Sequence, residues 1–225
     1  MGFNNEISDK LLGRNNGRLR DILNEVKKFN KNVEYCCTDL TRYEEIKKAV
    51  DECIDSFGTI DILINNAGIS QFDLIANLKI SDWNDVINTN LNGYFYTTRL
   101  ILPIMIKNKS GHIINIGSTM SKVTYPSFSA YNASKFGARA FTDVLSKEVV
   151  NKNIKVTFVG PGAIDTPIHA VIKGGMSEKE RKEKFLKPSD VAEIILFIIT
   201  RPDNLVIDEI YIYDLKSPYK VPLEE

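Results

Sequence analysis

Short apolar runs alternate with longer segments of helical periodicity along almost the whole chain, and this alternation constrains the fold most strongly. Several runs are apolar at consecutive positions, as expected for strands that are buried on both faces. Alternating strands and helices favour a parallel sheet with helical crossovers. The predicted strands are Lys10–Gly13, Val33–Cys36, Ile60–Ile64, His112–Ile116, Ile154–Val159 and Leu205–Tyr213, and the predicted helices are Arg18–Phe29, Tyr43–Phe57, Ser81–Lys107, Ala130–Asn151 and Ser189–Thr200. The sequence therefore predicts one α/β domain over residues 1–225.

The charge balance gives no sign of a nucleic-acid or anionic-membrane partner, because 29 basic and 29 acidic residues make the chain formally neutral. Its longest apolar runs, such as Ile194–Ile199, are too short to span a bilayer. The first ten residues lack the apolar core of a signal peptide. We therefore expect a cytoplasmic protein.

The cysteines and histidines form no pattern that indicates a metal site. Cys36, Cys37 and Cys53 have neither zinc-ligand spacing nor the arrangement of a disulfide framework, so we expect buried free thiols. His112 and His169 are the only histidines, and no partner residues recommend either as a catalyst or a metal ligand. We expect both to be structural.

Three residues with complementary chemistry surround the end of the predicted fourth strand. Ser118 follows that strand, and Tyr131 begins a helical pattern thirteen residues later, with Lys135 one turn further along the same face. A free tyrosine titrates near pH ~10, whereas an adjacent ammonium stabilises the phenolate. A serine hydroxyl beside the phenol can hold a carbonyl or alcohol oxygen. The set suits oxidation or reduction at a C–OH/C=O carbon beside a hydride carrier.

A second Tyr-x-x-x-Lys pair tests how specific this pattern is. Tyr43 and Lys47 have the same spacing, but they lie in a charged helical stretch, and position 30, thirteen residues earlier, is Asn. No strand-to-loop transition precedes them, so we expect Tyr43 on a helix surface. Ser118 and its strand are what distinguish the other pair.

The chain resembles the classical branch of the short-chain dehydrogenase/reductase family from about Leu11 to Tyr213. The resemblance rests on motifs that occur in order, each at the end of a strand or the start of a helix. They are Asp39–Leu40, Asn65-Asn66-Ala67-Gly68, Asn90, Ser118, Tyr131-x-x-x-Lys135, and Pro161-Gly162 followed by Thr166. The resemblance implies a Rossmann-like doubly wound parallel sheet with helices on both faces.

The resemblance also implies a role for each motif. Tyr131 would be the general acid/base, Lys135 would lower its pKa and bind the nicotinamide ribose, and Ser118 would orient the substrate oxygen. Asn90 would hold a helix kink and a water of the proton relay. The adenosine half of a nicotinamide dinucleotide would lie along Asp39, Leu40, Asn65, Ala67 and Gly68, and its nicotinamide end along Pro161, Gly162, Ile164 and Thr166.

The glycine-rich turn that opens this family's fold is missing from the sequence. Gly13 and Gly17 form only a Gly-x-x-x-Gly, no adequate strand precedes them, and too few residues separate them from Asp39. Lys10–Gly13 therefore corresponds to the family's second strand, and the first strand and helix are absent. Such a loss would expose two strand edges in the middle of the sheet. Either about 30 residues lie upstream of the given start (a family-based expectation), or the chain is a truncated relative.

Arg14 favours NADP(H) over NAD(H), because a guanidinium beside the adenosine ribose can bind a 2′-phosphate and no acid lies nearby in LLGRNNGR. The substrate pocket should be mostly apolar, with Met120, Tyr125 and residues 168–172. Residues 160–175 form an irregular segment that could act as a lid.

Three classes of function remain open at this point. The leading class is an NADP(H)-dependent oxidoreductase for a secondary alcohol or ketone, of the 3-oxoacyl or 3-hydroxy acid type. The family usually forms homodimers or homotetramers through Ser81–Lys107 and Ala130–Asn151. A non-catalytic scaffold protein and an epimerase of the extended branch are the alternatives, and the latter is disfavoured because no sugar-binding domain follows Asp214.

Overall fold

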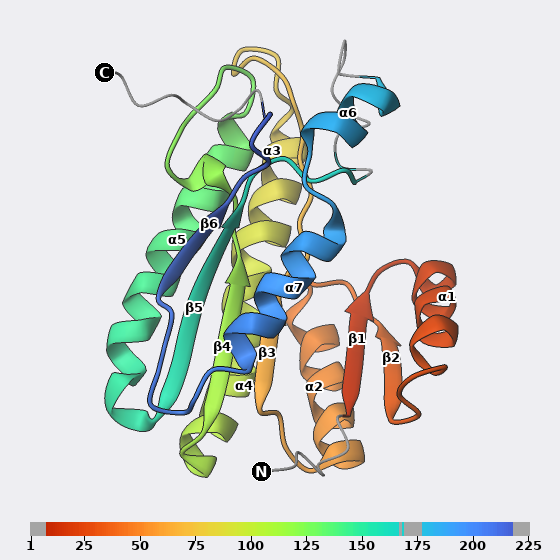
Figure 1. Ribbon diagram of the computed structural model, residues 1–225, viewed down its shortest axis with the longest axis vertical. Coiled ribbons are helices and arrows are strands. Elements are labelled where there is room, and N and C mark those ends of the chain that lie inside the picture. Colours follow the sequence, from red (N-terminus) through yellow and green to blue (C-terminus); the bar gives the residue numbers. More distant parts are fainter. Residues whose placement is uncertain (1–7, 167, 169–176, 218–225) are drawn as a thin grey trace.

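The structure, a computed structural model, describes residues 8–166, 168 and 177–217, in which strands and helices alternate as predicted (Figure 1). The strands are β1 (Asp9–Gly13), β2 (Val33–Cys37), β3 (Ile62–Asn65), β4 (Gly111–Ile116), β5 (Ile154–Pro161) and β6 (Glu209–Ile212). The α-helices are α1 (Asn16–Val26), α2 (Tyr43–Phe57), α3 (Ile80–Ile87), α4 (Gly93–Asn108), α5 (Ser129–Val149), α6 (Glu178–Lys184) and α7 (Pro188–Ile199). Shorter turns are the π-helical η1 (Asn88–Asn92) and the 3₁₀ turns η2 (Thr119–Ser121) and η3 (Val150–Lys152).

All strand pairs among the described residues are parallel, and they form two sheets. The larger sheet has the order β3-β4-β5-β6, with Ile113 opposite Val156 at its centre, and the smaller sheet is β1-β2. The carboxyl ends of parallel strands lie at one edge of a sheet, which is where ligands bind in open α/β folds.

Helices cover both faces of the larger sheet, which confirms the doubly wound fold. On one face, α2, α4 and α5 pack on β4 and β5, and Ile113 and Met105 are fully buried in this layer. On the other face, Ile114 and Ile116 of β4 pack against Ile198 of α7. In Figure 1, α7 crosses in front of the sheet and α4 and α5 lie behind it. Successive β4 side chains therefore enter opposite cores, as alternation along a strand requires.

No described strand lies between β1 and β3, so each of them has one unpaired edge. In the described part of the chain, β1 pairs only with β2 and β3 only with β4. On β3, Leu63 packs in the core, whereas Ile62 and Ile64 point to the other face and are 44% and 43% exposed. Among the described strands, β3 is therefore an edge strand of the larger sheet, and one of its faces carries large exposed apolar side chains.

Most predicted boundaries agree with the structure to within a few residues, and two predictions need correction. The last strand is only Glu209–Ile212, because the Leu205 N–H bonds to Pro202 O in a turn before it. The predicted Ser81–Lys107 helix is interrupted by η1. Helix α6 lies in the charged stretch Lys179–Lys184, which indicates a solvated helix face, and Ser177 and Glu180 form a capping box at its start.

The cysteines are free thiols as predicted, but contrary to the prediction none of them is fully buried. Cys37 is exposed, and Cys36 and Cys53 are partly buried. The β2 strand that carries Cys36 and Cys37 belongs to the small outer sheet, which explains their exposure. Within the described residues, no helix has both the length and the apolar character needed to cross a membrane.

Candidate active site

Ser118 lies in a tight turn where β4 ends. Its backbone is extended and its Oγ accepts a hydrogen bond from Met120 N at 3.1 Å, which caps η2. Gly117 makes this turn possible, because a Cβ there would lie 1.9 Å from Cζ of Phe158. Since its Oγ accepts from the backbone, the Ser118 hydroxyl proton is left for a side-chain or ligand oxygen beside it.

Tyr131 and Lys135 lie on the first two turns of α5, and the Lys135 ammonium group is hydrogen-bonded to the last residue of β4. Lys135 Nζ donates to Ile116 O at 3.0 Å, and Tyr94 Oη donates to the same carbonyl at 2.8 Å. Lys135 is only 3% exposed, and burial lowers its pKa to about 8. This lysine therefore holds its proton less tightly than a surface lysine does.

The expected lowering of the Tyr131 pKa by Lys135 is not found in this geometry. Burial raises the pKa of Tyr131, and hydrogen bonding with the Ser118 hydroxyl opposes this rise only in part. The Lys135 ammonium lies 5.6 Å from the centroid of the Tyr131 ring and donates to Ile116 O instead. Ser118 is thus the group that favours the phenolate here, and the raised pKa keeps Tyr131 protonated at neutral pH.

Asn90 connects the segment after β3 to α5 from inside the π-helical turn. Its Oδ1 accepts from Ile69 N at 2.9 Å, while its Nδ2 donates to Ile69 O at 2.9 Å and to Ser134 Oγ at 3.1 Å. The helix irregularity expected at Asn90 is therefore present as η1. Because all three bonds lie within the protein, Asn90 fixes the cleft wall from behind.

A cleft of about 850 Å³ opens at the carboxyl ends of β1, β3, β4 and β5, a size typical of ligand sites. It brings together most of the predicted site residues. These are Arg14, Ala67, Gly68, Ser118, Tyr131, Lys135, Pro161, Gly162, Ile164 and Thr166. Met120 and Ile168 of the predicted substrate pocket also line it, whereas residues 169–172 lie outside the described residues.

Four predicted site residues and one predicted pocket residue do not line this cleft. Asn90 lies behind it, and Leu40 packs against the core layer of α2 and α4. The Asn65 amide is buried, donating to Asn115 and accepting from Thr97. Tyr125 packs on Phe128.

Asp39 is the fourth of these residues, and its carboxylate caps the turn before α2 by accepting from Thr41 N at 3.0 Å. Burial raises the Asp39 pKa, but the Thr41 hydrogen bonds and the Arg14 charge outweigh it, so the pKa is lowered. Asp39 is therefore an ionised turn residue near Arg14.

Other lining residues were not anticipated from the sequence. Arg18 reaches the cleft from the first turn of α1, close to Arg14. Ser70 and Gln71 follow β3, where polar residues after a strand's carboxyl end could have indicated them. Ser70 Oγ is buried and, among the described residues, has no hydrogen-bond partner. A buried unpaired hydroxyl at a cleft is well suited to a ligand hydrogen bond.

The donor set in the cleft fits a phosphorylated dinucleotide in part. Two guanidinium groups, Arg14 and Arg18, suit a phosphate. Within the described residues no cluster of His, Cys, Asp and Glu could hold a metal ion. The cleft thus combines two guanidinium groups with the side chains of Ser118, Tyr131 and Lys135.

A parallel α/β sheet with this site at its carboxyl edge defines an oxidoreductase of the Rossmann type, and comparison with known proteins identifies the family. Residues 5–176 match the family described as short chain dehydrogenase, so the chain belongs to this family. It is 33% identical over 200 residues to an uncharacterized oxidoreductase of Staphylococcus aureus, covering 89% of this chain and 83% of that protein. It is also 33% identical over 196 residues to the 3-oxoacyl-(acyl-carrier-protein) reductase FabG of Thermotoga maritima, covering 85% and 80%.

Solved structures agree with this assignment. A closed form of serine dehydrogenase complexed with NADP+ superposes with a TM-score of 0.85 at 27% identity, covering 97% of this chain and 89% of that one. An alcohol dehydrogenase of the archaeon Thermococcus sibiricus, complexed with 5-hydroxy-NADP, has a TM-score of 0.84 at 23% identity, covering 94% and 88%. The protein is therefore a short-chain dehydrogenase/reductase with an oxidoreductase fold and site.

Proposed function

We propose that the protein interconverts a ketone and a secondary alcohol with NADP(H), and that Ser118, Tyr131 and Lys135 carry the proton transfer. The observation that carries the proposal is the convergence of these three side chains on one cleft. When bound, the nicotinamide supplies or accepts the hydride. The Ser118 hydroxyl orients the substrate oxygen and Tyr131 gives it a proton. Lys135, whose pKa burial lowers to about 8, can then return a proton to Tyr131.

The preference for NADP(H) is supported by Arg14 and Arg18, which bring two positive charges to the cleft. A 2′-phosphate pairs with guanidinium groups by charge-assisted hydrogen bonds, whereas a free 2′-hydroxyl gains little from them. NADP is named in the complexes of similar proteins, serine dehydrogenase among them. Binding to NADP(H) should therefore be tighter than binding to NAD(H).

A 3-oxoacyl or 3-hydroxy acid compound is the proposed substrate class. Supporting it are the similarity to a 3-oxoacyl reductase and to serine dehydrogenase, and the apolar Met120 and Ile168 beside the catalytic end. We also propose a homodimer or homotetramer built on α4 and α5. Phe95 and Phe136 are 48% and 40% exposed on these helices, as an unpaired interface would be.

The experiment is a panel of ketones and 3-oxo esters with NADPH and NADH, monitored by loss of absorbance of the reduced cofactor. We expect turnover with at least one 3-oxo ester and a preference for NADPH. Silence across the panel, together with no heat of NADPH or NADH binding in calorimetry, would refute the proposal. Size-exclusion chromatography with light scattering tests the oligomer, and a monomer at micromolar concentration would refute that part.

The second candidate is a non-catalytic binding or scaffold role for the 225 residues as given. The observation that favours it is the gap between β1 and β3, because the phosphate-binding turn of the family would follow a strand in that position. A chain in this role would bind neither dinucleotide. The binding measurement above therefore separates the two candidates.

A further inference from the structure

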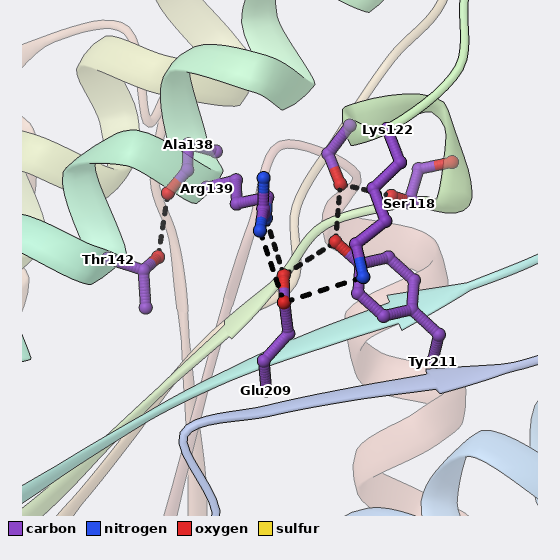
Figure 2. Close-up of polar contacts among 8 residues, drawn as sticks. Ser118, Lys122, Ala138, Arg139, Thr142, Glu209 and Tyr211 are labelled. Atoms are coloured by element: carbon purple, nitrogen blue, oxygen red, sulfur yellow. Dashed lines mark hydrogen bonds and ion pairs between the residues drawn. The ribbon is translucent and has the colours of Figure 1, made fainter.

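Glu209, at the start of β6, gathers contacts from several elements although it lies outside the cleft. Its carboxylate accepts hydrogen bonds from Arg139 Nε and from Arg139 Nη2 at 3.3 Å, and from Tyr211 Oη at 2.6 Å. Lys122 Nζ lies 3.5 Å from its other oxygen. Figure 2 shows the carboxylate between the Arg139 guanidinium on one side and Lys122 and Tyr211 on the other. One side chain therefore joins three partners.

These partners belong to the elements that carry the catalytic candidates. Arg139 lies on α5 one helical turn after Lys135, so it is part of the helix that positions Tyr131. Lys122 directly follows η2, four residues after Ser118. Two ion pairs to one carboxylate thus connect the Tyr131 helix to the Ser118 turn. They add to the hydrogen bonds that Asn132 of α5 donates to Met120 O and Val123 O, each at 2.8 Å.

A chain of hydroxyl groups makes a second connection from Glu209 to the turn. Tyr211 Oη lies 3.0 Å from Ser121 Oγ, which in turn lies 2.7 Å from Ser118 O. With Glu209 ionised, Tyr211 donates to it, and Ser121 has one proton for either Tyr211 or Ser118. The Ser118 carbonyl also accepts from Ser121 N at 3.0 Å, so it stays paired in both arrangements. Ser121 can therefore donate to Tyr211 while Tyr211 donates to the Glu209 carboxylate.

Gly160 leaves room for the Tyr211 ring to pack against β5. A Cβ on Gly160 would lie 2.3 Å from Cε1 of Tyr211, so only glycine leaves room for the ring on β5. Lys122 Nζ lies 3.7 Å from the ring centroid on the turn side. The ring is thus held between β5 and the Lys122 side chain, with its hydroxyl directed at Ser121.

Glu209 has the charge that this arrangement needs at neutral pH. Burial raises its pKa, but the hydrogen bonds from Arg139 and Tyr211 and the two positive charges outweigh burial, so the pKa is lowered. Burial and the adjacent Glu209 carboxylate raise the pKa of Tyr211. Glu209 is therefore ionised while Tyr211 remains a protonated donor.

We propose that Glu209 is a positioning residue: through Arg139, Lys122 and the Tyr211–Ser121 hydroxyls, it fixes the Ser118 turn relative to the helix that carries Tyr131. The proposal deepens the proposed function, since the distance between Ser118 and Tyr131 determines whether both can reach one substrate oxygen. Glu209 touches neither substrate nor cofactor in this arrangement, so it acts on turnover and not on cofactor binding.

The test compares Glu209→Gln and Tyr211→Phe with the control Asp143→Asn. Gln keeps the size of the side chain but removes its charge, and Phe keeps the ring but removes the hydroxyl. Asp143 is on the same helix α5 and pairs with Lys147 at 2.7 Å on an exposed face, so its change removes a similar ion pair away from the turn. Two quantities are measured: amide hydrogen exchange in residues 117–123, and kcat and KM.

We expect exchange in residues 117–123 to accelerate about tenfold or more in Glu209→Gln, because bonds to a charged group are lost. Tyr211→Phe should give a smaller increase, and Asp143→Asn none. In an active protein, kcat of Glu209→Gln should fall about tenfold to 100-fold with the cofactor KM nearly unchanged. A purely stabilising role would instead accelerate exchange throughout the protein.

Two results would overturn the proposal. One is unchanged exchange in 117–123 for both variants, whatever the activity. The other is faster exchange with wild-type kcat. If Glu209→Gln does not fold, Tyr211→Phe decides by the same criteria. Should the wild type turn over no substrate, the exchange data still decide whether Glu209 fixes the turn, and only the proposed function fails.

Discussion

Replacing Lys135 by Met should stabilise the protein, because the structure buries the ammonium group with little compensation. Lys135 is 3% exposed, and burial lowers its pKa from 10.5 to about 8. At ~1.4 kcal/mol per pKa unit, keeping this group charged at neutral pH costs about 3 kcal/mol. Losing the Lys135 hydrogen bond to Ile116 O reduces this gain in stability by only about 1 kcal/mol, because Tyr94 still donates to that carbonyl.

The net expectation is a gain of roughly 2 kcal/mol in the free energy of unfolding at pH 7, or a rise in Tm of roughly 4–8 °C for a chain of this size. The pH dependence gives a second signature. Between pH 8 and pH 10.5 the folded lysine loses its proton while the unfolded lysine keeps it, so wild-type stability rises with pH. The advantage of Lys135→Met is therefore full below about pH 8 and disappears as the pH approaches 10.5.

The assay is urea unfolding followed by circular dichroism at pH 7, 8, 9 and 10, with Lys147→Met as the control. Lys147 lies on the same helix, and its side chain is 72% exposed in an ion pair with Asp143. Its removal should change stability little. A destabilised Lys135→Met variant, or a gain that stays constant from pH 7 to pH 10, would refute the reasoning. Lys135→Met should also lose activity. A variant that is more stable but inactive would show that the lysine is kept for function at a cost in stability.

Three further predictions concern packing, acid stability and cofactor choice. Gly117→Ala should lose about 1–3 kcal/mol in urea unfolding, since its Cβ would overlap the Phe158 ring, whereas Gly17→Ala, whose Cβ would meet Asn15 Oδ1 at an ordinary contact distance of 3.5 Å, should not. Stability should fall as the pH drops from 6.5 through about 4. Burial, aided by the Lys155 charge, lowers the His112 pKa to about 4, so the unfolded histidine takes up a proton in this range while the folded one does not. A His112→Gln variant whose stability depends on acid pH in the same way would contradict this. Arg14→Ala with Arg18→Ala should weaken NADPH binding by about tenfold or more and leave NADH binding nearly unchanged, as calorimetry can check; equal losses for both cofactors would count against the 2′-phosphate site.

The sequence predicted the elements and the catalytic end of the cleft because both depend on local patterns. Apolar runs fix β4 and β5, and Ser118, Tyr131 and Lys135 follow from a strand end and a helix start. The charged stretch of α6 indicates a solvated helix face, but without apolar periodicity it does not fix the bounds of the helix. The ion pairs around Glu209 could not be predicted either, because Arg139 and Glu209 lie 70 positions apart in the sequence.

The cofactor end was harder to predict for a related reason. A motif gives the residue type at a strand's end, but the direction of its side chain depends on the packing behind it. Asn65 is bonded to Asn115 and Thr97 in the core, and the Asp39 carboxylate is used by Thr41. Arg18 reaches the cleft only because α1 begins beside it. These positions are decided by tertiary contacts, which a single sequence does not contain.

The most direct test of the central claim follows the transferred atoms. NADPH carrying deuterium at the transferable position of the nicotinamide is incubated with a 3-oxo ester that passes the activity panel, and the alcohol product is analysed by mass spectrometry. The account predicts one deuterium on the carbinol carbon with the wild type, and none with Tyr131→Phe, although this variant still binds NADPH. A Tyr131→Phe variant that forms labelled product at the wild-type rate would contradict it.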